Sequence, residues 1–351
     1  MISKEKVARF YNKDVYQYNL KNTAGMQVSV LNYGGIITKI LFYDKNGIKD
    51  NRILAYKDIS LYKDNPMFLG AIIGRIAGRI SNGTYKLDGS LYNLEKNEKD
   101  RHLHGGTAGF HHCFWNVDIK EDNRKSILQL RLIDKEHDGF VGDLSVLVEY
   151  SLDNDNILEI HYFVETNKKT ICNMTNHMYF NLLGSKSNDT IQDHYLKIDA
   201  DEIAVVDEKT LPTWDFLNVD NEKVFNFKEF RKVGLYGMNT HQQQKLVSKG
   251  YDHAFKLNKK SINDISLKEN KTGIRVDVNT TEDAVIIYSC NKVDILYDLE
   301  SHKLKKYKGI TIETQQLPDI VNTKEIDKII ITPDKPYDSR TTFKFSLEKG
   351  K

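Results

Sequence analysis

The sequence is poor in proline and cysteine and has no long apolar run. It contains five prolines and three cysteines in 351 residues. Cys113, Cys172 and Cys290 lie far apart and form no Cys-x-x-Cys pair, which favours reduced thiols over a disulfide framework. No run of about 18 apolar residues occurs, and the charged N-terminus does not resemble a signal peptide. We therefore expect a cytoplasmic protein that is not associated with a membrane.

An excess of charge of one sign is also missing. The formal net charge is +2 at pH 7, and the two signs are interspersed along the chain. Proteins that bind nucleic acid or an anionic membrane concentrate positive charge in a patch or stripe. The sequence therefore predicts no nucleic-acid or membrane partner.

Short alternating stretches separated by Asn, Asp and Gly dominate the chain. Asp88-Gly89 stands between two strand-like segments and is typical of a two-residue hairpin turn. In residues 157–164 an aliphatic or aromatic side chain recurs at every second position, which is the period of a half-buried strand. Many such strands predict an all-β fold, a large antiparallel β-sandwich.

Helical periodicity is scarce in comparison. Residues 58–62 and 227–230 are weak helix candidates of about one turn each, and the polar stretch 259–271 is the best candidate for a surface insertion. We find no internal repeat, low-complexity tract or flexible linker. The sequence therefore predicts one domain over residues 1–351.

Four polar side chains are candidates for chemistry, and each has an ordinary alternative. His104 precedes two glycines, which permit a ligand to approach closely, or it is a turn histidine without a role. His177 lies in a strand-like run and is either functional or a core histidine. Glu313 follows a probable strand as a half-buried or a surface carboxylate. Asp252 resembles a turn aspartate that bonds its own backbone.

Metal and nucleotide sites are poorly supported. His102, His104, His111 and His112 are close in sequence, but the chain has no His-Glu-x-x-His, no Cys-x-x-Cys and no carboxylate-rich cluster. The glycine-rich nucleotide motifs and the Gly-x-Ser-x-Gly elbow are also absent. We expect neither a metal nor a cofactor.

Five motifs in the same order resemble those of the aldose 1-epimerase (galactose mutarotase) family, between about residues 16 and 345. They are Leu-His-Gly-Gly with a later Gly-Phe and Trp in residues 103–115, Asp-Gly-Phe-Val-Gly-Asp-Leu in 138–144, Asn-Met-Thr-Asn-His-Met-Tyr-Phe-Asn-Leu in 173–182, Gly-Tyr-Asp-His in 250–253, and Glu-Thr-Gln with a later Pro-Asp and Asn in 313–322. The resemblance implies a β-supersandwich and an isomerase that interconverts the α and β anomers of aldoses such as galactose and glucose.

The resemblance also implies roles for individual residues. Glu313 would be the general base and His177 the general acid. Around a monosaccharide, the implied binding residues are His104, Arg79, Asp252 and Tyr179. Mutarotation moves protons only, so one carboxylate and one imidazole suffice without a metal or nucleotide. Arg75 is expected to be structural, and the protein to be a monomer or homodimer.

Two positions depart from the family pattern. Gly78 precedes Arg79 where the family usually has Asn, and Ile286 stands where it often has Gln. Each change removes a side chain expected to bond a sugar hydroxyl, so the preferred aldose stays open. The alternatives are a non-catalytic sugar-binding or regulatory protein on the same scaffold, and an epimerase for a phosphorylated or unusual aldose.

Overall fold

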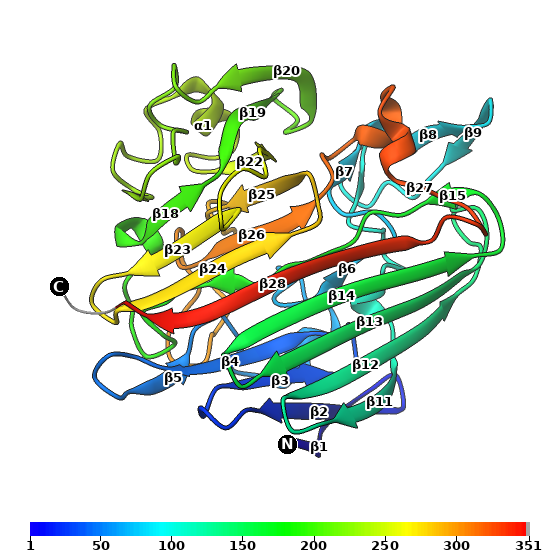
Figure 1. The fold of residues 1–351 in the computed structure, drawn as a ribbon. Helices are drawn as coiled ribbons and strands as arrows, with labels where there is room; N and C mark the ends of the chain where they lie inside the picture. Colours follow the sequence, from blue (N-terminus) through cyan, green and yellow to red (C-terminus); the bar gives the residue numbers. More distant parts are fainter. Residues whose placement is uncertain (349–351) are drawn as a thin grey trace.

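Antiparallel strands are the dominant regular structure of the computed structural model, which describes residues 1–348 (Figure 1). The all-β prediction is confirmed. The last three positions of the predicted domain, 349–351, lie outside the described residues. No helix within residues 1–348 is both long and apolar enough to cross a membrane.

A nine-stranded sheet spans the molecule. In spatial order its strands are β11 (Asn116–Glu121), β12 (Lys125–Asp134), β13 (Leu144–Asp153), β14 (Ile157–Thr166), β28 (Tyr337–Leu347), β24 (Ile274–Thr280), β23 (Ile265–Glu269), β18 (Tyr195–Ile198) and β21 (Arg231–Lys232). The predicted period of two is confirmed in β14, where Leu158, Ile160 and Val164 are buried and Glu159 is half-buried.

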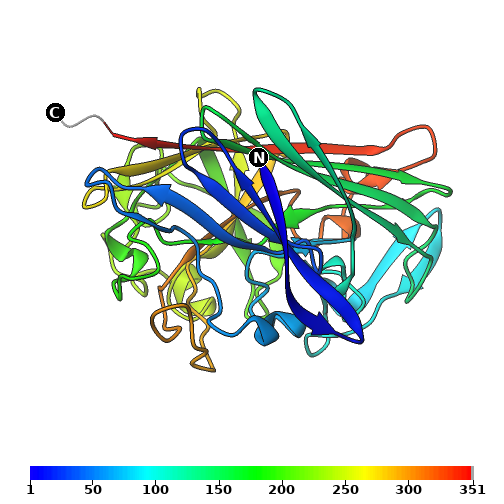
Figure 2. The ribbon, with the colours of Figure 1, turned by 90° about the horizontal axis from the view of Figure 1, so that it is seen from below.

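Two further sheets contribute to the same core. The first, in order, is β1 (Ile2–Phe10), β2 (Lys13–Lys21), β3 (Gln27–Leu31), β4 (Ile37–Tyr43) and β5 (Lys49–Asn51). The second is β17 (Tyr179–Phe180), β26 (Ile310–Gln315), β25 (Ala284–Tyr288), β22 (Asp252–Leu257), β19 (Ala200–Val206) and β20 (Pro212–Asn218). In Figure 2 the blue strands β1–β5 form a separate layer on one side of the sheet that contains the red β28. Val28, Val148, Ile312 and Phe343 belong to one buried cluster, so all three sheets share a core.

Short strand pairs and helical turns complete the fold. The pairs are β6 (Ile72–Ile73) with β16 (Thr175–Asn176), β7 (Arg79–Ile80) with β10 (His102–Leu103), β8 (Thr84–Leu87) with β9 (Ser90–Asn93), and β15 (Thr170–Ile171) with β27 (Ile330–Ile331). The helical segments are α1 (Gln242–Leu246), η1 (Ile59–Lys63), η2 (Ser81–Gly83), η3 (Phe110–His112), η4 (Ile191–Asp193), η5 (Ile320–Asn322) and η6 (Ile326–Lys328). The hairpin turn predicted at Asp88-Gly89 is confirmed, because it joins β8 to β9.

Two local predictions are wrong and one is close. The helical turn expected over 58–62 is found as η1, but residues 227–230 form no helix. The expected surface insertion 259–271 contains β23, whose Ile265 and Leu267 are fully buried between β18 and β24. The exposed polar residues at both ends of this stretch hid the strand, although Asp264, Ser266 and Glu269 are buried together with its apolar side chains.

Candidate active site

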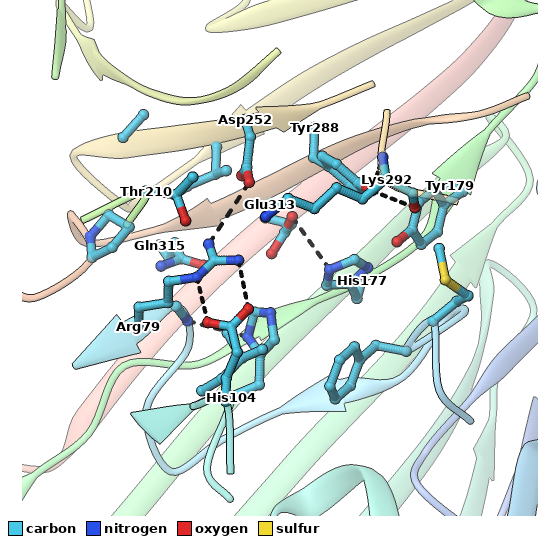
Figure 3. Close-up of a pocket in the computed structure, with 18 of the residues that line it drawn as sticks. Arg79, His104, His177, Tyr179, Thr210, Asp252, Tyr288, Lys292, Glu313 and Gln315 are labelled. Carbon is cyan, nitrogen blue, oxygen red and sulfur yellow. Dashed lines mark hydrogen bonds and ion pairs between the residues drawn. The ribbon is translucent and has the colours of Figure 1, made fainter. Parts of the chain in front are cut away.

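All six sequence-predicted site residues line one cavity of about 330 Å³. Strand β7 supplies Arg79, the residue after β10 is His104, and His177 lies between β16 and β17. Tyr179, Asp252 and Glu313 come from β17, β22 and β26 of the six-stranded sheet. Figure 3 shows their side chains converging on one space. Arg75 does not line this cavity; it is buried elsewhere, with its Nε 2.6 Å from Oδ2 of Asp134.

Glu313 is a buried carboxyl on a fully buried strand. Strand β26 lies between β17 and β25, and all of its residues are buried. Because side chains alternate across a strand, Thr311 and Glu313 face the same side, and Thr311 Oγ1 donates a hydrogen bond of 2.9 Å to Glu313 Oε1. Burial raises the pKa of Glu313 to about 8, and Asp252 also raises it, while the Thr311 hydrogen bond and Arg79 lower it.

His177 faces this carboxyl. Its backbone N–H donates to the Ala71 carbonyl over 3.0 Å, and its carbonyl accepts from the Gly70 N–H over 3.0 Å, which holds the residue in place. Its Nε2 lies 3.5 Å from Oε1 of Glu313. Burial lowers the pKa of His177 to about 4, with a further contribution from Arg79. The imidazole is therefore neutral near pH 7.

His104 is held by two bonds to Gly78. Its Nδ1 accepts a hydrogen bond of 3.2 Å from the Gly78 N–H, and its own N–H donates to the Gly78 carbonyl over 3.1 Å. Burial, with the neighbouring His177 and Arg79, lowers the pKa of His104 well below its usual range. Since Nδ1 accepts, the neutral ring carries its proton on Nε2. His104 is thus a hydrogen-bond donor for a ligand.

The glycine after His104 allows two backbone segments to pack closely. A Cβ atom at Gly105 would lie 2.0 Å from the Gly74 carbonyl oxygen, and the residue has a φ of +86°. Glycine is therefore required at this position by contact between two backbone segments.

Arg79 is held between two carboxylates. Its Nε and Nη2 donate to the two oxygens of Glu98 over 2.8 and 3.1 Å, and its Nη1 lies 3.7 Å from Oδ2 of Asp252. Burial alone would lower the pKa of Arg79, but Asp252 and Glu98 outweigh it and raise that pKa. Asp252 therefore pairs across the cavity and is not the turn aspartate of the ordinary alternative.

Several residues that line the cavity are absent from the sequence prediction. They are Phe68, Glu98, Tyr288, Lys292 and Gln315. Gln315 follows Glu313 by two positions on the same strand, so the period of a strand could have identified it. Glu98 and Lys292 carried no such signal, because they lie in charged or irregular segments that only the tertiary fold brings to the cavity. The predicted Tyr179 packs its ring against His177, with centroids 5.0 Å apart.

The cavity also contains a group of possible metal ligands. One ligand atom from each of His104, His177 and Glu313 lies within 4.8 Å of the others. The donor chemistry does not fit a metal, because Nδ1 of His104 is occupied by the Gly78 N–H and Nε2 carries the ring proton. Burial also raises the pKa of Glu313 to about 8, so this carboxyl holds a proton near neutral pH.

Gly78 and Ile286, the two departures from the family pattern, make part of the wall apolar. Gly78 has a φ of +82°, and a Cβ there would lie 3.1 Å from the Pro318 side chain. Ile286 pairs with Glu313 on one neighbouring strand and with Ala254 on the other. Neither residue offers a side-chain hydrogen bond to a ligand.

Comparisons with known proteins agree over nearly the whole chain. A family model described as aldose 1-epimerase matches residues 16–344. The galactose mutarotase of Homo sapiens is 30% identical over 325 residues, with 92% of each chain covered. The aldose 1-epimerase of Escherichia coli K12 is 31% identical over 336 residues, with 94% of each covered. The crystal structure of galactose 1-epimerase from Lactobacillus acidophilus NCFM superposes with a TM-score of 0.89 at 30% identity, over 99% of both chains.

Proposed function

The chain belongs to the aldose 1-epimerase family and is an isomerase of aldoses, and we propose that it interconverts the α and β anomers of a free hexose such as galactose or glucose. The proposed acid–base pair is Glu313 and His177. The observation that supports it most directly is the 3.5 Å separation of Glu313 Oε1 and His177 Nε2 inside the cavity. The anomeric hydroxyl and the ring oxygen are bonded to the same carbon, so two groups at this separation can reach both oxygens.

In the proposed reaction each proton has a defined source and destination. Glu313 removes the proton of the anomeric hydroxyl, and His177 gives a proton to the ring oxygen. The bond between C1 and the ring oxygen breaks and leaves an open-chain aldehyde. Rotation about the C1–C2 bond presents the other face of the aldehyde, and ring closure reverses both transfers. Each group therefore both accepts and donates a proton within one cycle.

The number of titratable protons on Glu313 and His177 is consistent with this series of proton transfers. Between about pH 4 and about pH 8 Glu313 and His177 together hold one titratable proton, which lies on Glu313 before a sugar binds. Hydrogen bonds from sugar hydroxyls to a carboxylate stabilise its ionised form. Binding of the sugar is therefore expected to favour the ionised carboxylate with a protonated imidazole, the form that starts ring opening.

The other predicted residues would bind the sugar. Arg79 and the Nε2–H of His104 offer positive charge and a donor for negative charge that develops on the sugar oxygens. Asp252 and Gln315 can accept hydrogen bonds from hydroxyls. Positioned proton transfer of this kind typically contributes about 10²–10⁴-fold in rate.

Polarimetry of freshly dissolved α-D-galactose and α-D-glucose, with EDTA present, tests the proposal. We expect micromolar protein to speed equilibration, and Glu313→Gln and His177→Asn each to abolish nearly all of the acceleration without loss of the native circular dichroism spectrum. Lys306→Met, a change at an exposed lysine, is the matched control and should retain full activity. Activity of either site variant comparable to wild type would refute the assigned roles.

A second candidate is favoured by Gly78 and Ile286, which offer no hydrogen bond to a ligand. In this alternative the protein binds a sugar without catalysing its mutarotation. Calorimetric binding of galactose without faster equilibration would support it. Acceleration with a phosphorylated hexose alone would support an epimerase for that substrate instead.

A further inference from the structure

Lys292 brings an unpaired ammonium group into the cavity. The residue follows strand β25, lines the cavity and is half-buried. Within residues 1–348 its Nζ forms no ion pair or hydrogen bond. The other buried or half-buried charged groups of the cavity have partners: Arg79 with Glu98 and Asp252, and Glu313 with Thr311. Three N–H donors of Lys292 are therefore available to a ligand.

The backbone of Lys292 is fixed on an aromatic side chain of the same cavity. Its N–H donates to the hydroxyl of Tyr288 over 3.0 Å, and the same hydroxyl donates to the Lys292 carbonyl over 3.2 Å. The Tyr288 ring packs edge-on against Tyr179, with centroids 6.0 Å apart, and Tyr179 in turn contacts His177. Figure 3 shows the Lys292 side chain directed into the pocket from the side of Tyr288. The lysine is thus positioned by the residues that border the proposed acid–base pair.

The charges around Lys292 indicate the kind of ligand atom that it would meet. Burial lowers the pKa of Lys292, and Arg79 lowers it further, while Asp252 and Glu98 raise it. The two carboxylates balance the charges of Arg79 and Arg101, and their own negative charge would repel a phosphate dianion. One ammonium beside them suits a neutral oxygen better than an anionic group.

Part of the cavity wall offers no side-chain hydrogen bond to a sugar, so a donor elsewhere in the cavity would contribute to binding. Gly78 and Ile286 have no side-chain donor, and Ile286 lies directly across from Glu313 in the sheet. A sugar hydroxyl that loses its hydrogen bonds to water at this wall and gains no protein partner would weaken binding of the sugar. Lys292 is a half-buried residue of the same cavity that can donate a hydrogen bond to a sugar without breaking an existing one.

We propose that Lys292 is a specificity-determining residue that donates a hydrogen bond to one non-anomeric hydroxyl of a neutral aldose. This inference rests on the proposed function, since it assumes that the cavity binds a sugar. It identifies the substrate class as an uncharged aldose that has a hydroxyl within reach of Lys292.

Kinetics of the wild type and of Lys292→Met with galactose and with its deoxy derivatives test this inference. Methionine keeps an unbranched side chain but removes the ammonium. We expect kcat/KM for galactose to fall about 10- to 100-fold, the usual value of a hydrogen bond to a charged group. For three of the four sugars 2-, 3-, 4- and 6-deoxy-D-galactose, kcat/KM of Lys292→Met should be lower than that of the wild type by the same factor. The one that lacks the partner hydroxyl should react equally with both proteins.

Controls separate this role from a general loss of structure. Lys292→Arg keeps a charged donor and should recover part of the activity, and Lys306→Met should behave as wild type throughout. An equal loss for galactose and all four deoxy sugars would overturn the inference, because Lys292 would then act only through structure. A larger effect of Lys292→Met on galactose 6-phosphate than on galactose would also overturn it, in favour of an anionic substrate.

Calorimetric dissociation constants for the same equilibrated sugars separate this inference from the proposed function. If the wild type binds galactose but does not speed mutarotation, the proposed function fails. The role of Lys292 in binding can still be tested, because Lys292→Met should raise Kd for galactose about tenfold or more and leave Kd for one deoxy sugar unchanged. Equal Kd values in wild type and Lys292→Met overturn the role of Lys292, whether or not the enzyme turns over. A wild type that binds none of these sugars overturns both proposals.

Discussion

The Asn173 side chain bonds both backbone groups of Gln316. Its Oδ1 accepts from the Gln316 N–H over 3.0 Å, and its Nδ2 donates to the Gln316 carbonyl over 3.4 Å. Asn173 begins the segment that leads to His177, and Gln316 directly follows the strand that carries Glu313. This buried link therefore connects the two chain segments whose separation sets the distance between the proposed acid and base.

Asn173→Ala should weaken catalysis more than binding. The change leaves the Gln316 N–H buried without its partner, which costs about 1–3 kcal/mol of folding free energy. We expect a lower melting temperature, and a kcat reduced about tenfold with little change in KM, because the acid and base lose their alignment. Polarimetric kinetics and thermal unfolding measure the two effects. Asn173→Asp keeps the acceptor and should recover part of kcat; an Asn173→Ala enzyme with wild-type kcat would show that the link is purely structural.

The pH dependence of kcat/KM should be a bell with limbs near pH 4 and pH 8. Below about pH 4 the pair of Glu313 and His177 binds two protons and lacks a base, and above about pH 8 it holds none and lacks an acid. Rates measured by polarimetry, corrected for spontaneous mutarotation, check this profile. Asp252 raises the pKa of Glu313, so Asp252→Asn should move the alkaline limb to lower pH. A limb that stays in place would contradict the assignment of that limb to Glu313.

The strands were largely predictable because their pattern is local. The alternation in β14 and the turn at Asp88-Gly89 depend on neighbours in the sequence, and both predictions are confirmed. Strand β23 was missed because its two apolar side chains, Ile265 and Leu267, lie in a strongly charged stretch, and only pairing with β18 and β24 reveals it. Short strands of this kind depend on tertiary contacts more than on composition.

The cavity was predictable only where a motif marked it. The motifs placed His104, His177 and Glu313, and the structure brings them together. Glu98 and Lys292 reach the cavity from segments with no recognisable pattern, so their contacts follow from the fold alone. The bonds between His104 and Gly78 show the same limit, since they join two strands that are distant in sequence.

Glu313→Gln should stabilise the folded protein at alkaline pH. Burial raises the pKa of Glu313 from 4.5 to about 8 in the folded state. A carboxyl with a raised folded pKa contributes stability below its unfolded pKa and loses it as pH rises, so wild-type stability should fall by about 1.4 kcal/mol per pH unit between these values. Glutamine cannot ionise and avoids this loss.

Urea unfolding of both proteins at pH 4 and pH 8 measures the difference. The two free energies of unfolding should be similar at pH 4, and the variant should be more stable by a few kcal/mol at pH 8. Glu208→Gln, at an exposed position, should show no such pH-dependent gain. A Glu313→Gln protein less stable than wild type at pH 8 would contradict the desolvation of this carboxyl. The expected gain would show that burial of the proposed acid–base carboxyl lowers the stability of the folded protein.

Substitution of Arg75 by Met should lower stability but not activity, whereas substitution of Arg79 by Met should lower activity more than stability. Arg75 is 1% exposed, and its guanidinium is bonded to Asp134 and to the carbonyls of Lys135 and Val141. Arg75→Met removes the buried cation of Asp134 and leaves His137, whose Nε2 lies 3.2 Å from Asp134 Oδ1, as its remaining ion-pair partner. Breaking a buried ion pair typically costs about 3–5 kcal/mol, and we expect a loss near the lower end of this range because His137 stays in place. The activity per folded molecule should stay near wild type.

Arg79→Met should instead lower kcat/KM with only a modest change in melting temperature. Its partner Glu98 keeps an ion pair of 3.1 Å with Arg101, and the vacated space opens to the solvent-accessible cavity. Thermal unfolding and polarimetry of the two variants, each normalised to folded protein, distinguish the roles. Loss of activity in folded Arg75→Met, with wild-type activity in Arg79→Met, would reverse the assignment. The expected outcome would show that Arg75 stabilises the core and Arg79 acts in the cavity, although they lie only four positions apart. The structural reason is that Arg79, in the short strand β7, faces Glu98, while Arg75 is buried in the interior.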